Sequence, residues 1–243
     1  MDKTFIFDYD DTLAPNHNDY SYAQLKFGRW VIKKLKNKAP DLQTIINLEV
    51  EIDRKLVKTM GFLMERFPTS FQKTYEIICE EKDKKCSKED LKKAYDVGMS
   101  AFDEKRWKQE GLVEGAKETL DYLVEKEKDE LILLTKGDPR VQEKKIRATN
   151  CMKWFGDKIY IVPDKNEGII KKVVGNRVKS KVWHVGNSIR SDVYPALKAR
   201  IKMIYIPCET WAYEREHKGV PEDPKLITFQ QIIEIKNNYN SLV

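Results

Sequence analysis

The sequence predicts an α/β protein: a doubly wound parallel sheet with a helical domain inserted after the first strand. Two observations support this prediction. In the second half of the chain, short continuous apolar runs alternate with helical patterns, which is typical of buried parallel strands joined by helices. Between the first apolar run and this half lies a long, charged segment with helical periodicity and no convincing strand. A chain of 243 residues is long enough for a core domain that carries a smaller insertion.

The first strand is predicted at residues 3–7, where a β-prone run ends at an acidic cluster. In the segment that follows, apolar residues recur at helical spacing. Helices are predicted there at residues 20–37, 42–60, 70–81 and 88–107. Ser87 precedes the last helix and stands three residues before Asp90, as in a capping box with Asp in place of Glu. The sequence therefore predicts a helical domain at residues 17–107.

The remaining residues, 1–16 and 108–243, are predicted to form the α/β core. Further strands are predicted at residues 131–134, 159–162, 181–185 and 203–206. Helices are predicted at residues 115–126, 141–148, 168–174, 193–199 and 229–235. Repeated strand–helix units of this kind form a parallel sheet covered by helices on both faces.

The charge pattern and the cysteine spacing argue against several functional classes. The net charge is +6, but the lysines alternate with acidic residues, as in residues 80–85, which is typical of a solvated helix face. No apolar run approaches the roughly 18 residues of a membrane span. The four cysteines form no CxxC pair, so we expect neither a disulfide framework nor a zinc site. We expect a cytoplasmic monomer or homodimer without a membrane or nucleic acid as its main partner.

Polar side chains directly follow the predicted strands, where ligands of open parallel sheets bind. These residues are Asp8 and Asp10 after the first strand, Thr135 after the second, Lys165 after the third and Asp192 after the fourth. Clustered carboxylates would repel each other and a phosphate unless a hard divalent cation bound them together, and Mg²⁺ prefers such oxygen ligands. A lysine and a hydroxyl would stabilise the remaining phosphoryl charge. The set therefore predicts phosphoryl transfer.

These residues resemble the four motifs of the haloacid dehalogenase-like (HAD) phosphatases, in the order in which that family has them. The four segments are Asp8-Tyr9-Asp10-Asp11-Thr12-Leu13, Thr135-Lys136-Gly137, Lys165, and Gly186-Asn187-Ser188-Ile189-Arg190-Ser191-Asp192. The inserted helical segment is similar to the C1 cap of the family. The resemblance implies a Rossmann-like core and a Mg²⁺-dependent phosphatase that acts on a small phosphorylated metabolite.

The resemblance also implies a role for each matching position. Asp8 would be the nucleophile that forms an aspartyl-phosphate, and Asp10 would protonate the leaving oxygen and then activate water. The Thr135 hydroxyl and the Lys165 ammonium would act on the phosphate. The backbone amides of Lys136 and Gly137 would bind it as well. Mg²⁺ would lie among Asp8, the Asp10 carbonyl and Asp192. Asn187 replaces the Asp of many relatives, which leaves open whether its side chain contacts the metal directly.

Other residues near the motifs have simpler interpretations. We expect Asp11 to cap the following turn, Thr12 to support the loop, and His184 to be a hydrogen-bonded core histidine. Of the aromatic residues Tyr20, Phe27, Trp30 and Trp107, most are expected to be packed in a core, with one or two of them facing the substrate. Two rival functions are a phosphomutase with the same nucleophile and a non-catalytic binding protein that keeps the fold. Incubation with a sugar 1-phosphate would separate the three functions. Release of inorganic phosphate would indicate a phosphatase, isomerisation a phosphomutase, and no turnover of any phosphate ester a binding protein.

Overall fold

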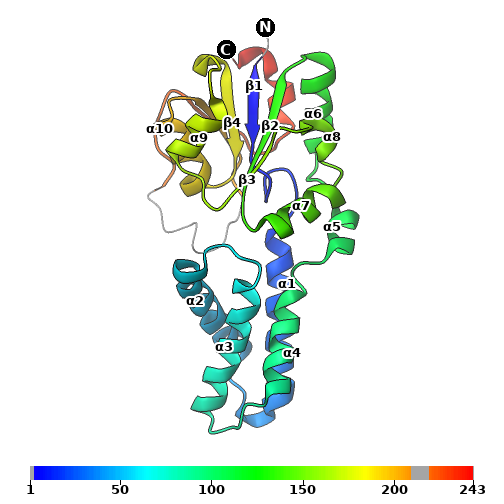
Figure 1. Cartoon of the computed structure of the whole chain (residues 1–243), viewed down its shortest axis with the longest axis vertical. Coiled ribbons are helices and arrows are strands. Elements are labelled where there is room, and N and C mark those ends of the chain that lie inside the picture. Colours follow the sequence, from blue (N-terminus) through cyan, green and yellow to red (C-terminus); the bar gives the residue numbers. More distant parts are fainter. Residues whose placement is uncertain (1–2, 209–218, 243) are drawn as a thin grey trace. The chain divides into compact units, whose positions relative to one another are not determined.

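The computed structural model describes residues 3–208 and 219–242 and divides into two compact units (Figure 1). The first unit consists of Met1–His17 and Glu104–Val243, and the second of Asn18–Asp103. The expected boundaries lay after residues 16 and 107, whereas the observed division falls after residues 17 and 103. No helix within the described parts of the chain is long and apolar enough to cross a membrane.

Within the described residues, the first unit contains a six-stranded, entirely parallel sheet with the strand order β3-β2-β1-β4-β5-β6. The strands are β1 (Thr4–Phe7), β2 (Glu130–Lys136), β3 (Ile159–Val162), β4 (Val182–Gly186), β5 (Lys202–Tyr205) and β6 (Leu226–Thr228). Because β1 lies between β2 and β4, the strand order reverses at β1, which is the topological switch point of a doubly wound sheet. The predicted fold class is confirmed. Only β6 was not predicted, since it is three residues long and partly exposed.

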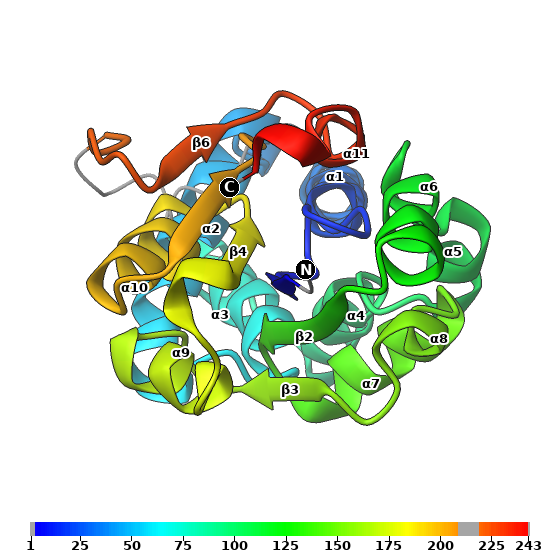
Figure 2. The same cartoon turned by 90° about the horizontal axis from the view of Figure 1, so that it is seen from above.

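Helices cover both faces of this sheet. The helices of the first unit are α5 (Glu104–Glu110), α6 (Ala116–Asp121), α7 (Pro139–Ala148), α8 (Met152–Phe155), α9 (Glu167–Val174), α10 (Tyr194–Lys198) and α11 (Glu234–Asn237). On one face Phe5 and Phe7 of β1 pack with α6, α8 and α11. On the other face Ile6 packs with α9 and α10. Figure 2 shows these two groups of helices on opposite sides of the sheet. Side chains that alternate along β1 are thus buried on both faces, which explains its continuous apolar sequence.

Two predicted helices differ most from the observed ones in where they begin or end. The helix predicted at residues 229–235 begins only at Glu234, because the amide of Phe229 donates to Tyr205 and extends the sheet. The helix predicted at residues 88–107 is α4 (Lys88–Met99), and α5 is separate. After Met99, three successive amides donate to carbonyls three residues back instead of four, which tightens and ends the helix. The chain passes into the first unit directly after this turn.

The second unit is a group of α-helices. They are α1 (His17–Leu35), α2 (Leu42–Met60), α3 (Arg66–Glu81) and α4. Its core is rich in aromatic rings, such as Phe27 and Phe71, whose centroids are 4.6 Å apart, and Trp30 and Tyr75 at 4.7 Å. Ser87 caps α4 as predicted, since its side chain accepts a hydrogen bond from the amide of Asp90. The expected core packing is confirmed for Phe27 and Trp30.

Candidate active site

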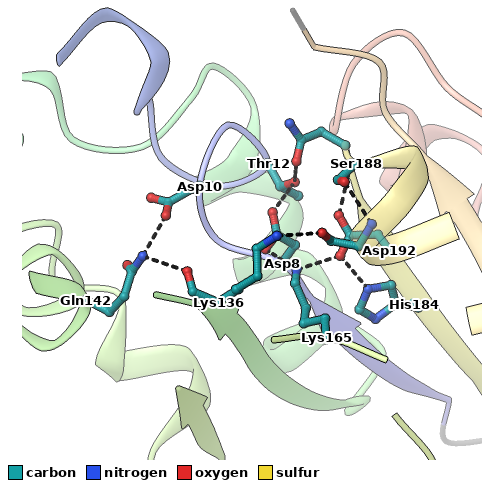
Figure 3. A network of polar contacts seen from close by, with 11 residues as sticks. Asp8, Asp10, Thr12, Lys136, Gln142, Lys165, His184, Ser188 and Asp192 are labelled. Carbon is teal, nitrogen blue, oxygen red and sulfur yellow. Dashed lines mark hydrogen bonds and ion pairs between the residues drawn. The ribbon is translucent and has the colours of Figure 1, made fainter. Parts of the chain in front are cut away.

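Side chains that follow three strands of the sheet, β1, β3 and β4, meet at its switch point. Asp8 comes directly after β1, Thr135 is near the end of β2, Lys165 follows β3, and Asp192 lies in the turn after β4. Figure 3 shows Asp8, Lys165 and Asp192 pointing toward one another. The convergence expected from the sequence is therefore present in the structure for these three side chains.

The Asp8 carboxylate is buried and held from several sides. Lys165 Nζ lies 2.5 Å from Asp8 Oδ1, and Thr12 Oγ1 donates to Asp8 Oδ2 at 3.0 Å. The backbone amide of Asp8 donates to the carbonyl of Val185 at 2.8 Å, which ties the start of the loop to β4. Burial raises the pKa of Asp8 to about 7; Lys165 opposes this rise and Asp192 adds to it. Thr12 supports the loop as expected, by orienting the carboxylate.

Lys165 links two carboxylates. Its Nζ lies 2.6 Å from Asp192 Oδ1 in addition to its contact with Asp8. Burial works against the charge of this lysine, but Asp192 and Asp8 outweigh it and raise the pKa of Lys165 above its ordinary value. Burial likewise opposes ionisation of Asp192, yet Lys165 and a histidine hold the pKa of Asp192 well below its usual range. Two carboxylates therefore share one ammonium group.

Asp192 lies on a π-helical turn, η4 (Ile189–Val193), that directly follows β4. The amide of Ser188 donates to its Oδ2 at 3.0 Å. Gly186 lets the carboxylate approach the strand, because a Cβ at Gly186 would lie 2.4 Å from Cγ of Asp192. Single π-helical turns are frequent at functional sites, where they change the direction of a side chain. This turn brings Asp192 back over the end of its own strand.

His184 contacts the site, which the sequence did not indicate. Its side chain is fully buried in β4, and Nε2 lies 2.9 Å from Asp192 Oδ1. Burial lowers the pKa of His184, so the ring is neutral and Nε2–H is the donor. Nδ1 then has no hydrogen-bond partner among residues 3–208 and 219–242. The expectation of a core histidine is right about burial, but the partner of this histidine is a site carboxylate.

The second predicted motif supplies an unpaired hydroxyl. Thr135 is fully buried, and its Oγ1 has no hydrogen-bond partner in the part of the chain that the structure describes. An orphaned buried hydroxyl costs free energy unless a ligand satisfies it. Lys136 Nζ donates to Ser191 Oγ at 2.7 Å, so this side chain connects β2 to η4.

Gly137 does not have the role that its motif implied. Its amide donates to the carbonyl of Val162 at 3.0 Å, so it is committed to the sheet and is not available to a phosphate. This geometry contradicts the expected donor role. Gly137 instead has a φ of +152°, and a Cβ there would lie 2.8 Å from Nε2 of Gln142. Glycine at this position lets the Gln142 side chain reach the end of β2.

The two other aspartates of the first motif are held by different partners. Asp11 Oδ1 accepts from the amides of Asn16 at 2.8 Å and His17 at 2.9 Å, which caps the chain as it enters α1, as expected. The Asp10 carboxylate is bound by Gln142 and Lys145, both from α7. Neither of these α7 residues was singled out by the sequence, because one glutamine and one lysine on a charged helix carry no local signal.

The oxygen groups near Asn187 fit a divalent cation. Within residues 3–208 and 219–242 no three His, Cys, Asp or Glu side chains form a metal site, so a cation would need backbone and amide ligands as well. One terminal atom of Asn187 lies 3.2 Å from Asp8 Oδ2, from the Asp10 carbonyl and from Thr12 Oγ1. As an amide nitrogen this atom donates to them. As an oxygen it would lie from each of these three oxygens at a distance near the roughly 3 Å that separates neighbouring ligands around octahedral Mg²⁺.

Comparisons with known proteins agree with this architecture. A family model described as haloacid dehalogenase-like hydrolase matches residues 3–200. A haloacid dehalogenase-like family hydrolase from Xanthomonas campestris is 20% identical with a TM-score of 0.73, covering 99% of this chain and 91% of that one. YfnB from Bacillus subtilis, assigned as a HAD-hydrolase and bound to magnesium, is 15% identical with a TM-score of 0.59, covering 98% and 99%.

A protein from Thermotoga maritima assigned as a beta-phosphoglucomutase is 17% identical with a TM-score of 0.61, covering 99% of this chain and 100% of that one. A search of curated proteins gave no significant match. At these identities the solved structures show a shared fold.

Proposed function

Since the chain belongs to the haloacid dehalogenase-like hydrolase family, we propose that it is a Mg²⁺-dependent phosphatase of a small phosphorylated metabolite. The observation that carries the proposal is the arrangement of Asp8, Lys165 and Asp192, with contacts of 2.5 and 2.6 Å through one ammonium group. Asp8 is the nucleophile: one carboxylate oxygen attacks phosphorus, the ester oxygen leaves, and an aspartyl-phosphate forms. Water then attacks this intermediate and releases inorganic phosphate.

The other residues of the site would each perform one task. Asp10 donates a proton to the leaving oxygen and later accepts one from water. Lys165 and the Thr135 hydroxyl stabilise charge on the phosphoryl oxygens. Asp8, the Asp10 carbonyl, Asn187 and Asp192 would hold Mg²⁺, which, when bound, neutralises part of the phosphoryl charge. An alkoxide, the basic leaving group of an alkyl phosphate, needs a proton when it leaves, whereas a halide does not, so the presence of Asp10 favours a phosphate ester over a haloacid as substrate.

The substrate class follows from the same features. The reacting group is buried between strand ends, and its surroundings supply cations and donors for one phosphoryl group. The inserted helical unit resembles a C1 cap, which supports the proposal that this unit selects the leaving group. A phosphomutase would use the same nucleophile, and the two activities differ in whether water or a second hydroxyl of the substrate accepts the phosphoryl group.

Phosphate release from a panel of phosphorylated metabolites, with and without Mg²⁺, tests the proposal. The Asp8→Asn variant is expected to lose turnover by at least about 10³-fold, because the amide is no nucleophile. It should keep the fold, since asparagine has the same shape. Asp157→Asn, at an exposed position of the same unit, is the matched control and should behave as wild type.

Trapping the phosphoenzyme by acid quench provides a second measurement. Radiolabel from the substrate should stay on wild type and be absent from Asp8→Asn. Folded wild-type protein that releases no phosphate from any ester would refute the proposal in favour of a binding protein. Isomerisation of a sugar 1-phosphate without phosphate release would instead favour a phosphomutase.

A further inference from the structure

Two side chains of α7 bind the Asp10 carboxylate from opposite oxygens. Gln142 Nε2 lies 2.6 Å from Asp10 Oδ2, and Lys145 Nζ forms an ion pair with Asp10 Oδ1. Lys145 Nζ also donates to Asn16 Oδ1 at 2.7 Å, and Gln142 Nε2 to the carbonyl of Lys136 at 3.2 Å. Figure 3 shows Gln142 between Asp10 and the end of β2. The carboxylate is thus fixed from both of its oxygens by a rigid element.

Lys145 is buried in a way that a surface lysine of a charged helix is not. Its side chain is only 2% exposed, whereas the adjacent Lys144 is exposed. Taking an ammonium group out of water costs several kcal/mol unless partners compensate it. Here the compensation comes from Asp10, from Asn16, and from the rings of Tyr9 and Trp107, whose centroids lie 5.6 and 5.7 Å from Nζ. The first unit therefore holds one buried ammonium group beside Asp10.

Gln142 and Lys145 lie three residues apart on α7, so both project from one face of the helix. The opposite face carries exposed residues, including Glu143 and Lys144. Pro139 is at the start of α7, and Asp138 caps it by accepting from the amide of Arg140 at 2.9 Å. A capped helix that begins just after β2 places its inward face toward the loop after β1. The helical backbone of α7 therefore determines the positions of the Gln142 and Lys145 side chains.

We propose that Lys145 and Gln142 are positioning residues that hold the Asp10 carboxylate in the orientation for proton transfer. The inference rests on the proposed function, because it assigns these residues a task in that reaction. A general acid must be aligned with the leaving oxygen, and a displacement of about 1 Å can cost on the order of 10²-fold in rate. Because separate donors bind the two carboxylate oxygens, one oxygen remains anchored while the other exchanges a proton.

The dependence on the leaving group distinguishes positioning from general support of the fold. A 4-nitrophenolate leaves without a proton, whereas a benzyl alkoxide requires one. For wild type, Lys145→Met, Gln142→Met and the control Lys144→Met, kcat/KM is measured with 4-nitrophenyl phosphate and with benzyl phosphate. This constant reports steps up to release of the leaving group, so the later role of Asp10 toward water does not affect the comparison.

Lys145→Met is expected to lower kcat/KM for benzyl phosphate by about 10- to 100-fold and for 4-nitrophenyl phosphate by less than about 3-fold. Gln142→Met should shift the ratio in the same direction by a smaller factor, and Lys144→Met should leave both constants unchanged. In an Asp10→Asn background, Lys145→Met should change the ratio by less than about 3-fold, because the group that it positions is gone. The double variant also removes the partly buried carboxylate that Lys145→Met leaves without its ion-pair partner, so it tests the idea even if Lys145→Met alone folds poorly.

Two results would overturn the inference. Equal losses for both esters in Lys145→Met and Gln142→Met would show that these residues only support the structure. An undiminished effect of Lys145→Met in the Asp10→Asn background would show that Lys145 acts on something other than Asp10. A failure of the proposed function would be distinguishable from these two results, because the wild-type protein would then hydrolyse neither ester. In that case the positioning role would be refuted as well.

Discussion

Replacing Glu49 by glutamine tests whether a carboxyl group in the core of the helical unit is neutral. Glu49 lies on α2 and is fully buried. Gln24 Nε2 donates to its Oε2 at 2.7 Å, and its Oε1 lies 2.5 Å from Ser70 Oγ. Ser70 Oγ also lies 2.6 Å from the carbonyl of Phe67. A hydroxyl has one proton, so if Ser70 donates to Phe67, the proton between Ser70 and Glu49 comes from Glu49.

The size of the expected pH-dependent loss of stability follows from the pKa of Glu49. Burial raises the pKa of Glu49 from 4.5 to about 8, and Asp53 adds to this rise. The folded form therefore holds the proton more tightly than the unfolded chain. The resulting stability is fully present below pH 4.5 and is lost as the pH rises to about 8. At about 1.36 kcal/mol per pH unit, the loss over this window is about 5 kcal/mol. Glutamine can accept from Gln24 and donate to Ser70, so Glu49→Gln should lack this loss.

Amide hydrogen exchange in α2 and α3, corrected for intrinsic exchange rates, measures the opening free energy of these helices from pH 5 to pH 9. Near pH 5 the two proteins should agree within about 1 kcal/mol, and toward pH 8 the variant should exceed wild type by several kcal/mol. Glu51→Gln is the control, since Glu51 is exposed on the same helix and pairs with Lys55 at 2.6 Å. Parallel pH profiles of wild type and Glu49→Gln would refute the reasoning. So would a variant that is weaker by about 2 kcal/mol near pH 6, because it would mean that Glu49 is ionised there.

Two further substitutions have opposite expected effects on stability. Thr135→Val removes a buried hydroxyl that has no partner in the described chain. The free energy of unfolding, measured by thermal denaturation, should therefore be unchanged or higher by about 1 kcal/mol. Its phosphate release should nevertheless fall by about 10- to 100-fold through loss of a phosphate donor, and a stable, fully active variant would contradict this role. Arg66→Met leaves Asp53 buried without its ion-pair partner and should cost about 3–5 kcal/mol in urea unfolding. Adding Asp53→Asn should recover most of this loss, and no recovery would show that the cost is one of packing.

The sequence by itself determined five of the six strands described in the sheet and the strand ends that carry the site. Leu131–Leu134 reads as a strand because parallel strands are buried on both faces and need apolar side chains throughout. Asp8, Lys165 and Asp192 could be grouped in advance because the carboxyl ends of parallel strands lie along one edge of a sheet. Both inferences depend on local patterns: a short run of apolar residues marks each strand, and the polar residue after the run marks the end of that strand.

Only the tertiary structure decided which charged groups are buried and what they contact. Lys145 is one of 45 lysines and arginines, and its partner Asp10 lies 135 residues away in the sequence. His184 could be identified as buried, but its bond to Asp192 depends on the π-helical turn after β4. Gly137 matched a phosphate-binding motif, yet its amide is committed to β3. The free energy of a buried charge depends on the partners that the fold assembles around it, and no local pattern records those partners.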